Sequence, residues 1–212
     1  NQVVSYFFRC LGDKIFVHHC IPQDRTGNRV DPPDSGIEIR RCSEISCCIS
    51  VQERHLPTFP IEDRIVVHHG LRELQRAINN RLQVEIRKCR RTSCAGECEY
   101  MITPGNHLFI EVPSFTEDAL RKLYGLNCVK TCILSDIPAS LDVLEKQYRL
   151  VSVIHHYAAS PNDKGKIGHY VAICRRTKGY WEVYDDTKKK VKSLKETAEV
   201  NPHMLYYVLS SL

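Results

Sequence analysis

The sequence predicts an α+β fold in which antiparallel strands outnumber helices. First, the C-terminal part holds short runs rich in Val, Ile and Tyr, separated by turn residues, as is typical of strands in an antiparallel sheet. Second, the middle of the chain repeats one design at residues 37–47 and 84–94, where an Ile-Arg strand runs into a Cys-x4-Cys turn. Few stretches show helical spacing of apolar residues, so we expect helices to be the minority.

Composition limits the class of protein. Hydrophobic residues make up 42% of the 212-residue chain, which is enough for a core, and 26% of the residues are charged. No apolar run approaches the roughly 18 residues of a membrane helix, and the first residues lack the charged start of a secretory signal. The chain does not begin with Met, so we expect a fragment or a processed piece. We therefore expect no membrane partner and a location in the cytoplasm, the nucleus or both.

The net charge of +5 is mildly basic, and lysines cluster in one region near the C-terminus. We interpret this cluster as a solvated face, because no aromatic residues are interleaved with the lysines as in a nucleic-acid-binding patch. We therefore do not expect nucleic acid as a partner. A zinc-dependent nucleic-acid module remains a third hypothesis, and it would show a steep fall of affinity with salt. The cluster comprises Lys188, Lys189, Lys190, Lys192 and Lys195.

The N-terminal part predicts one helix and one linker. Apolar residues recur at helical spacing over residues 3–17, which indicates an amphipathic helix. Residues 21–36 are polar and contain three prolines and two glycines, so they read as a linker.

Eleven cysteines are a high and odd count. Without an export signal the reducing interior of the cell is the expected compartment, and clustered cysteines there indicate metal binding rather than disulfides. Two Cys-x4-Cys turns that face each other would form a tetrahedral four-sulfur zinc site. Cys48 and Cys98 compete as ligands, and unligated remnants of such a site are the alternative. The predicted zinc ligands are Cys42, Cys47, Cys89 and Cys94.

Four further elements are predicted between and after the cysteine turns. The alternation of Pro57, Phe59 and Ile61 favours a strand, and a helix follows that contains residues 71–78 and stops at residues 79–80. Residues 108–112 indicate a second strand. A capping box at Ser114 then starts a helix that ends at residue 124.

The C-terminal part predicts a hairpin that carries a candidate catalytic pair. Residues 148–154, 169–174 and 180–184 read as strands, and the last two are joined by a Lys-Gly turn. His169 begins one strand of this hairpin and Asp185 ends the other, so antiparallel pairing brings them close together. A carboxylate beside a histidine fixes its tautomer and stabilises the imidazolium. The alternative is a structural histidine followed by an acidic turn.

This region resembles the His box of the ubiquitin-specific proteases. The resemblance rests on the order and spacing of Tyr-Arg-Leu-Val-Ser-Val-Ile, His156, the Gly-His-Tyr-Val-Ala run at residues 168–172, Trp181, and the Tyr-Asp-Asp run at residues 184–186. One difference is Ala158, where the family usually has Gly. The resemblance implies that His169 is the general base and that Asp185 orients it, with Asp186 as the second candidate for the orienting carboxylate. It also implies that Gly168, His156 and Tyr170 contact the substrate.

The resemblance extends to the rest of the chain. Residues 1–15 are similar to the helix that follows the catalytic Cys in this family, with Val4 in place of an Asp. The family often carries a structural zinc at the tip of a "fingers" subdomain, which agrees with the two cysteine turns. The implied organisation is a partial papain-like catalytic domain: a thumb-type helix at residues 1–20, fingers at 37–112, and a palm sheet with the His box at 113–212. By the same resemblance, we expect most thumb helices to be missing from this sequence.

The resemblance implies a cysteine-type hydrolase that cleaves isopeptide bonds at the C-terminus of ubiquitin, or of a related modifier, on ubiquitinated proteins. No segment matches the Gly-Asn-Thr-Cys-Tyr type of motif that carries the nucleophile, so we expect it upstream and expect this chain alone to be inactive. The alternative is an inactive ubiquitin-binding scaffold of the same fold. The imperfect match of residues 1–15 to the family's helix and the Ala158 difference favour this alternative. The His169–Asp185 pair argues against it.

Overall fold

The structure is a computed structural model that describes residues 35–44, 46–47, 51–113, 123–125, 132–157, 169–176 and 178–210. The helix expected at residues 3–17, most of the linker at 21–36, and the loop containing Ala158 lie outside the described residues. So do Cys48, Gly168 and all but the end of the helix expected at 116–124. None of the helices in the described ranges is long and apolar enough to cross a membrane.

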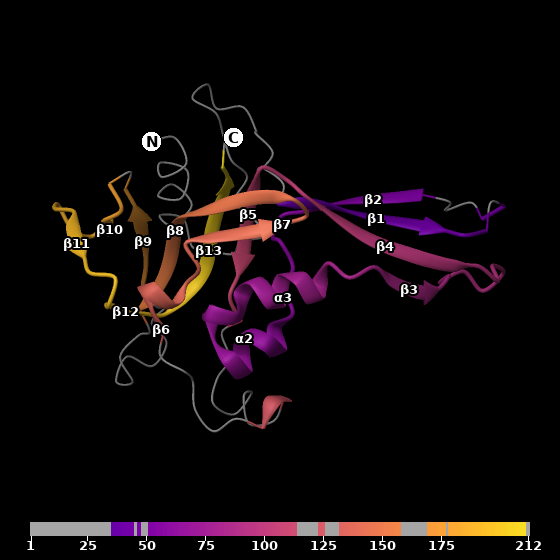
Figure 1. Ribbon diagram of the computed structural model, residues 1–212, viewed down its shortest axis with the longest axis horizontal. Coiled ribbons are helices and arrows are strands. Elements are labelled where there is room, and N and C mark those ends of the chain that lie inside the picture. Colours follow the sequence, from indigo (N-terminus) through magenta and orange to yellow (C-terminus); the bar gives the residue numbers. More distant parts are fainter. Residues whose placement is uncertain are drawn as a thin grey trace.

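A seven-stranded sheet forms the larger part of the molecule (Figure 1). Six strands follow the order β11-β10-β9-β8-β13-β5, β7 pairs with β8, and each of these pairs is antiparallel. The sheet therefore brings the C-terminal strand between two earlier ones. Its strands are β5 (His107–Glu111), β7 (Ser140–Val143), β8 (Lys146–Tyr157), β9 (His169–Arg175), β10 (Trp181–Tyr184), β11 (Lys192–Leu194) and β13 (Pro202–Leu209).

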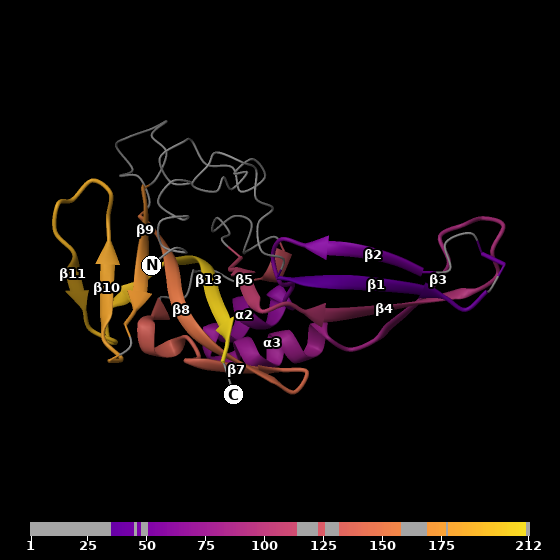
Figure 2. The same ribbon diagram turned by 90° about the horizontal axis from the view of Figure 1, so that it is seen from above.

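A four-stranded antiparallel sheet projects away from the larger sheet as an arm (Figures 1 and 2). Its order is β2-β1-β4-β3, so the two Ile-Arg strands predicted from the sequence flank the long strand β4. The cysteine turns lie where β1 ends and β4 begins, at the end of the arm. The strands are β1 (Gly36–Cys42), β2 (Val51–Leu56), β3 (Glu85–Lys88) and β4 (Glu97–Pro104).

Helices α2 and α3 lie in sequence between β2 and β3 of the arm, but they pack on the larger sheet. Helix α3 buries Leu74, Ala77 and Ile78 completely, and Gln75 on its other side exchanges two hydrogen bonds with the backbone of Asp142 in β7. This contact fixes α3 against the sheet. The remaining elements are α2 (Asp63–His69), η1 (Leu71–Glu73), α3 (Leu74–Arg81), η2 (Leu134–Asp136), and the small β6–β12 pair (Cys132–Ile133 and Glu199–Val200).

The main hydrophobic core lies between the larger sheet and these helices. Two of its largest buried side chains are tyrosines that satisfy their hydroxyls. Tyr148 donates to the carbonyl of Gly105 at 2.7 Å, and Tyr207 donates to the carbonyl of Pro138 at 2.7 Å. A buried hydroxyl without a partner would be costly, so these two bonds help to fix β8 and β13 in register.

The α+β class and the antiparallel strands predicted from the sequence are confirmed, with one wrong element. Residues 57–61 form no strand, although Phe59 is buried and its N–H donates to the Phe109 carbonyl at 2.6 Å. Pro57 and Pro60 lack the N–H groups that hydrogen bonds between β-strands require. The alternation of apolar residues here therefore indicates burial and not strand pairing. The helix expected at 71–78 is α3 preceded by a 3₁₀ turn, and it runs to Arg81.

Candidate catalytic and metal sites

The β9–β10 hairpin brings His169 and Asp185 together. His169 begins β9 and Asp185 directly follows β10, and the two strands pair in register with Tyr184 opposite Ala172. The distance from His169 Nε2 to Asp185 Oδ1 is 3.0 Å, and the distance to Asp186 Oδ1 is 3.7 Å. Asp185 is therefore the hydrogen-bond partner of the imidazole, and Asp186 lies at longer range.

Asp185 is held by several donors besides His169. Its side chain is 6% exposed and accepts hydrogen bonds from the Thr187 backbone N–H at 3.0 Å and the Thr187 hydroxyl at 2.6 Å. The Lys188 ammonium lies 2.9 Å from its second oxygen. Burial alone would raise the pKa of Asp185, but hydrogen bonds from Thr187, Lys188 and His169 outweigh it and hold the pKa well below its usual range. The carboxylate therefore stays ionised at neutral pH.

The His169 ring is placed to use its second nitrogen. Because Nε2 bonds to Asp185, Nδ1 is the nitrogen left for another partner, and the side chain is 39% exposed. The Tyr157 ring lies nearly parallel to the imidazole at 6.4 Å. The donor atoms of His169, Asp185 and Asp186 also lie within 4.8 Å of one another, but the Lys188 ammonium on Asp185 opposes a metal cation there. The arrangement is that of a base held by a carboxylate.

His156 and Tyr170 lie near this pair, His156 at the end of β8 and Tyr170 at the start of β9. The β8–β9 register places His156 opposite Tyr170 and Tyr157 opposite His169, and the His156 and Tyr170 rings are 4.6 Å apart. Asn201 fixes this part of β8, since its carbonyl accepts the His156 N–H and its side-chain amide donates to the His156 carbonyl. The structure thus brings five of the predicted site residues to one end of the β8–β9–β10 unit: His156, Tyr170, His169, Asp185 and Asp186.

The described cysteines outside the arm are poor nucleophiles. Burial raises the pKa of Cys174 in β9 to about 11, and burial also raises the pKa of Cys132 to about 11. Neither thiol forms a reactive thiolate at neutral pH.

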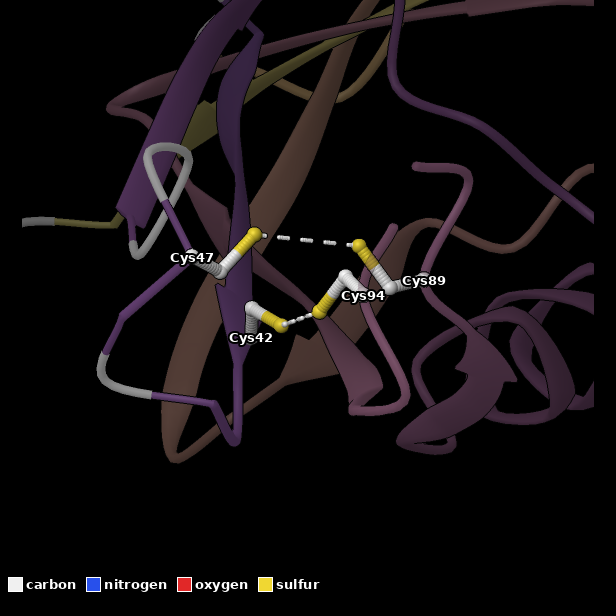
Figure 3. A group of neighbouring side chains, drawn as sticks. All are labelled: Cys42, Cys47, Cys89 and Cys94. Atoms are coloured by element: carbon white, nitrogen blue, oxygen red, sulfur yellow. Dashed lines mark hydrogen bonds between the residues drawn. The ribbon is translucent and has the colours of Figure 1, made fainter. Parts of the chain in front are cut away.

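Four cysteines gather at the end of the arm (Figure 3). Each cysteine turn contributes two of them. The closest sulfurs pair across the two turns: Cys42 and Cys94 are 3.6 Å apart, and Cys47 and Cys89 are 3.9 Å apart. All four sulfurs lie within 4.8 Å of one another. We call Cys42, Cys47, Cys89 and Cys94 the four-cysteine group. They could hold a metal ion, and they are the set that the spacing of the turns predicts.

The geometry fits a tetrahedral ion. Metal–sulfur bonds of about 2.3 Å give sulfur–sulfur edges of about 3.8 Å, close to both contacts. Gly96 permits the approach of the two cysteine turns, because a Cβ there would lie 2.9 Å from the Cβ of Glu44 and 3.1 Å from the Cys42 sulfur. The Gly96 N–H also donates to the Cys94 sulfur at 3.4 Å.

The pKa values of two thiols of this group are shifted in opposite directions. The backbone N–H of Arg91 lowers the pKa of Cys89 to about 6 against the effect of burial, and neighbouring thiols add to the shift. A backbone hydrogen bond at Glu44 lowers the pKa of Cys42, but burial and the other three thiols outweigh it and raise this pKa to about 12. Binding of a metal ion must therefore release protons from the group.

Several residues of both sites were not found from the sequence. Thr187 stands two positions after Asp185, the spacing of an Asx-type turn, which is a signal that could have identified it. In the sequence, Lys188 stands out only as a member of the lysine cluster. Gly96 and Asn201 carry no local signal, because their partners lie about fifty residues away in sequence.

The family comparison agrees with this fold. The family model described as "Ubiquitin carboxyl-terminal hydrolase" matches residues 28–207, and the chain belongs to this family. Among curated proteins, the "120.7 kDa protein in NOF-FB transposable element" of Drosophila melanogaster is 30% identical over 115 residues. This match covers 54% of the chain but 10% of the relative.

Solved structures show the same fold. A chain in "Structure of the SAGA Ubp8/Sgf11/Sus1/Sgf73 DUB module" matches with a TM-score of 0.52 and 16% identity, covering 86% of this chain and 39% of that one. A chain of the same kind of module bound to monoubiquitin matches with a TM-score of 0.54 and 10% identity, covering all of this chain and 48% of that one. A yeast SAGA DUB module gives 0.55, 13% identity and 50% of that chain. The chain spans half or less of each of these solved chains.

Proposed function

We propose that this protein acts as a thiol hydrolase that cleaves isopeptide bonds at the C-terminus of ubiquitin or a ubiquitin-like modifier. The observation that carries the proposal is the His169–Asp185 hydrogen bond, with Asp185 buried, ionised and held by three further donors. Membership of the ubiquitin carboxyl-terminal hydrolase family supports the substrate class. The solved structure of a similar module is bound to monoubiquitin, which supports ubiquitin as the partner.

In the proposed mechanism the nucleophile is a thiol supplied outside the described residues. The Nδ1 atom of His169 takes the thiol proton, and the thiolate attacks the carbonyl carbon of the modifier's last residue. The imidazolium then gives its proton to the leaving lysine amine, which leaves a thioester that water hydrolyses. Asp185 holds the imidazole through Nε2 and stabilises its charged form, and Asp186 remains in reserve at longer range.

We further propose that the tail of the modifier passes His156, Tyr170 and Gly168 on its way to the thiol. The two rings stand side by side, and Tyr170 directly follows His169 in β9. Burial lowers the pKa of His156, so this imidazole stays neutral. Ubiquitinated proteins are the proposed substrates. The cytoplasm or the nucleus is the proposed location, as expected for a protein of this class.

Zinc is the proposed ion of the four-cysteine group. Four sulfur donors with near-tetrahedral edges and no open position are typical of a structural zinc site. Bound zinc would stabilise the end of the arm and would take no part in the chemistry at His169. The arm then corresponds to the zinc-bearing fingers expected from the sequence.

The test uses the longest native protein that contains this chain, with ubiquitin carrying an electrophile at its C-terminus and with an isopeptide-linked substrate. The expected result is a covalent adduct and hydrolysis, both lost in His169→Ala by at least about 100-fold, since general-base catalysis contributes about 10²–10⁴-fold. Lys195→Ala, an exposed change on the same domain, is the matched control and should retain full activity.

Unchanged hydrolysis in a folded His169→Ala protein would refute the assignment of the base. Tight binding of ubiquitin with neither adduct nor hydrolysis in the unsubstituted protein would instead favour the inactive scaffold. Binding of ubiquitin by His169→Ala, measured by isothermal titration calorimetry, separates loss of chemistry from loss of recognition.

A further inference from the structure

The guanidinium group of Arg40, in strand β1 of the arm, lies against the four-cysteine group. Its Nη2 atom is 3.3 Å from the sulfur of Cys98 and 3.7 Å from the sulfur of Cys89, both within the range of an N–H···S hydrogen bond. One nitrogen therefore contacts a member of the group and a fifth, separate cysteine. No other arginine or lysine in the described ranges has a hydrogen bond to a cysteine sulfur.

The backbone sets this contact up. Arg40 stands two residues before Cys42 in β1, so both side chains leave the same face of the strand. Cys98 lies directly opposite Cys42 on β4, and Tyr100 lies directly opposite Arg40. The guanidinium rests 5.6 Å from the centre of the Tyr100 ring. The Tyr100 ring and the β1–β4 register together orient the guanidinium toward the sulfurs of Cys89 and Cys98.

Cys98 is completely buried, yet it does not belong to the four-cysteine group. A fifth thiol so near a metal site is a competing ligand, and the sequence alone does not exclude Cys98 as one. In the structure its sulfur faces the guanidinium of Arg40. The hydrogen bond gives Cys98 a partner other than the ion.

The charge of the site calls for a cation at this position. Four thiolates on one divalent ion leave a net charge of −2, and burying this charge is costly without compensation. Arginine keeps its charge at all relevant pH values and can donate several N–H groups at once. A hydrogen bond to a metal-bound thiolate lowers the electron density on sulfur and orients the ligand.

We propose that Arg40 is a positioning residue of the zinc site, which holds the ligand Cys89 by an N–H···S hydrogen bond and keeps Cys98 out of the coordination sphere. This inference rests on the proposal that the four-cysteine group binds zinc. It adds two assignments to that proposal. Arg40 offsets the charge of the zinc-bound thiolates, and Cys98 is a buried partner of Arg40 and not a ligand.

The test compares Arg40→Met with Arg87→Met. Arg87 lies over the same Tyr100 ring at 5.5 Å but hydrogen-bonds to Glu85, so the control removes a neighbouring arginine of the same kind. Zinc affinity is measured by competition with a chromogenic chelator. We expect Arg40→Met to lose about 10–100-fold in affinity, the usual effect of removing an outer hydrogen-bond partner of a metal ligand. Arg87→Met should change affinity less than about 3-fold.

Three further variants make the result independent of folding. Arg40→Lys keeps the charge but contacts the two sulfurs less well, so its affinity should fall between those of Arg40→Met and the unsubstituted protein. Cobalt substituted for zinc reports the ligands directly, since its visible and charge-transfer bands depend on the number of sulfurs. Cys98→Ser should keep the four-sulfur spectrum, whereas Cys89→Ser should lose it.

Equal zinc affinity for Arg40→Met and Arg87→Met would overturn the role of Arg40, and a changed cobalt spectrum for Cys98→Ser would overturn its exclusion from the site. Either result leaves the zinc proposal in place. An unsubstituted protein that binds no zinc or cobalt would overturn both the zinc site and this inference. The outcomes are therefore distinguishable.

Discussion

At the scale of single residues, the candidate catalytic centre depends on one buried carboxylate. Asp185 is almost fully covered and accepts bonds from a histidine, a threonine and a lysine. Such a carboxylate can keep its charge in a buried place only because these donors replace the water it has lost. The same contacts that orient His169 therefore also contribute to folding stability.

The pH dependence of stability follows from the depressed pKa of Asp185. A carboxyl whose folded pKa lies below its unfolded value near 3.9 stabilises the fold above that value, and the contribution is lost as pH falls toward the folded pKa. We expect Asp185→Asn to lower the free energy of unfolding by about 1–3 kcal/mol at pH 7 and by less at pH 3. Urea denaturation at both pH values measures this difference.

Asp142→Asn is the matched control, because Asp142 is exposed and contacts Gln75 through its backbone only. It should have little effect at either pH. An equal loss for Asp185→Asn at pH 7 and pH 3 would show that the charge of Asp185 is not what stabilises the fold.

At the scale of elements, the two cysteine turns act as one unit at the end of the arm. The second turn approaches the first so closely that Gly96 has no room for a side chain beside Glu44 and Cys42. The backbone N–H of Ser43 also donates to the carbonyl of Glu97 at 2.8 Å, which ties the end of β1 to the start of β4. The strand register thus sets the distance between the two pairs of sulfurs.

We expect Gly96→Ala to weaken metal binding. The added methyl group would meet the Glu44 side chain and the Cys42 sulfur, so the two turns must move apart and the sulfurs leave tetrahedral positions. Zinc affinity, measured by chelator competition, should fall by about 10-fold or more. Ser93→Ala, an exposed change in the same turn, should leave it unchanged. Equal affinities for the two variants would show that the close approach is not required.

At the scale of the whole molecule, the two sheets have different sources of stability. The larger sheet packs on the helices around an extended hydrophobic core that includes Leu108, Tyr148 and Leu205, all completely buried. The arm contributes to this core mainly at its base, through Leu56 and Ile102. Its far end has few buried apolar residues, so a bound metal ion is the expected stabiliser there.

Removal of the metal should therefore act locally. We expect one zinc ion per chain by elemental analysis, and we expect a chelator to increase amide hydrogen exchange in β1, β3 and β4 while protection in β8 and β13 stays unchanged. Cys89→Ser should reproduce this pattern without chelator, and Cys132→Ser should not, because Cys132 lies outside the four-cysteine group. Less than about half an ion per chain, or increased exchange throughout both sheets, would contradict this view.

The sequence by itself determined the local features of this protein. Alternation of apolar residues predicted the hairpin of β9 and β10, and a hairpin fixes which residues meet, so the closeness of His169 and Asp185 followed from pattern alone. The repeated Cys-x4-Cys turns likewise predicted a four-cysteine group, because both pairs sit at the ends of similar strands. The hairpin needed only short-range pairing and the period of a strand. The four-cysteine group joins residues 42 and 52 positions apart, and its prediction rested on the repetition of one local design in the two turns.

Only the tertiary structure decided what depends on contacts between distant segments. The short strands β6, β7 and β12 lack a strong pattern and form because a partner strand lies beside them. Phe59 is buried but does not belong to a strand. In the sequence the alternation of apolar residues around it looks the same whether or not the segment pairs with a strand. The separation of Cys98 from the four-cysteine group, and the placement of Arg40 between Cys98 and Cys89, follow from the register of β1 on β4, which brings together residues 49 and 58 positions apart.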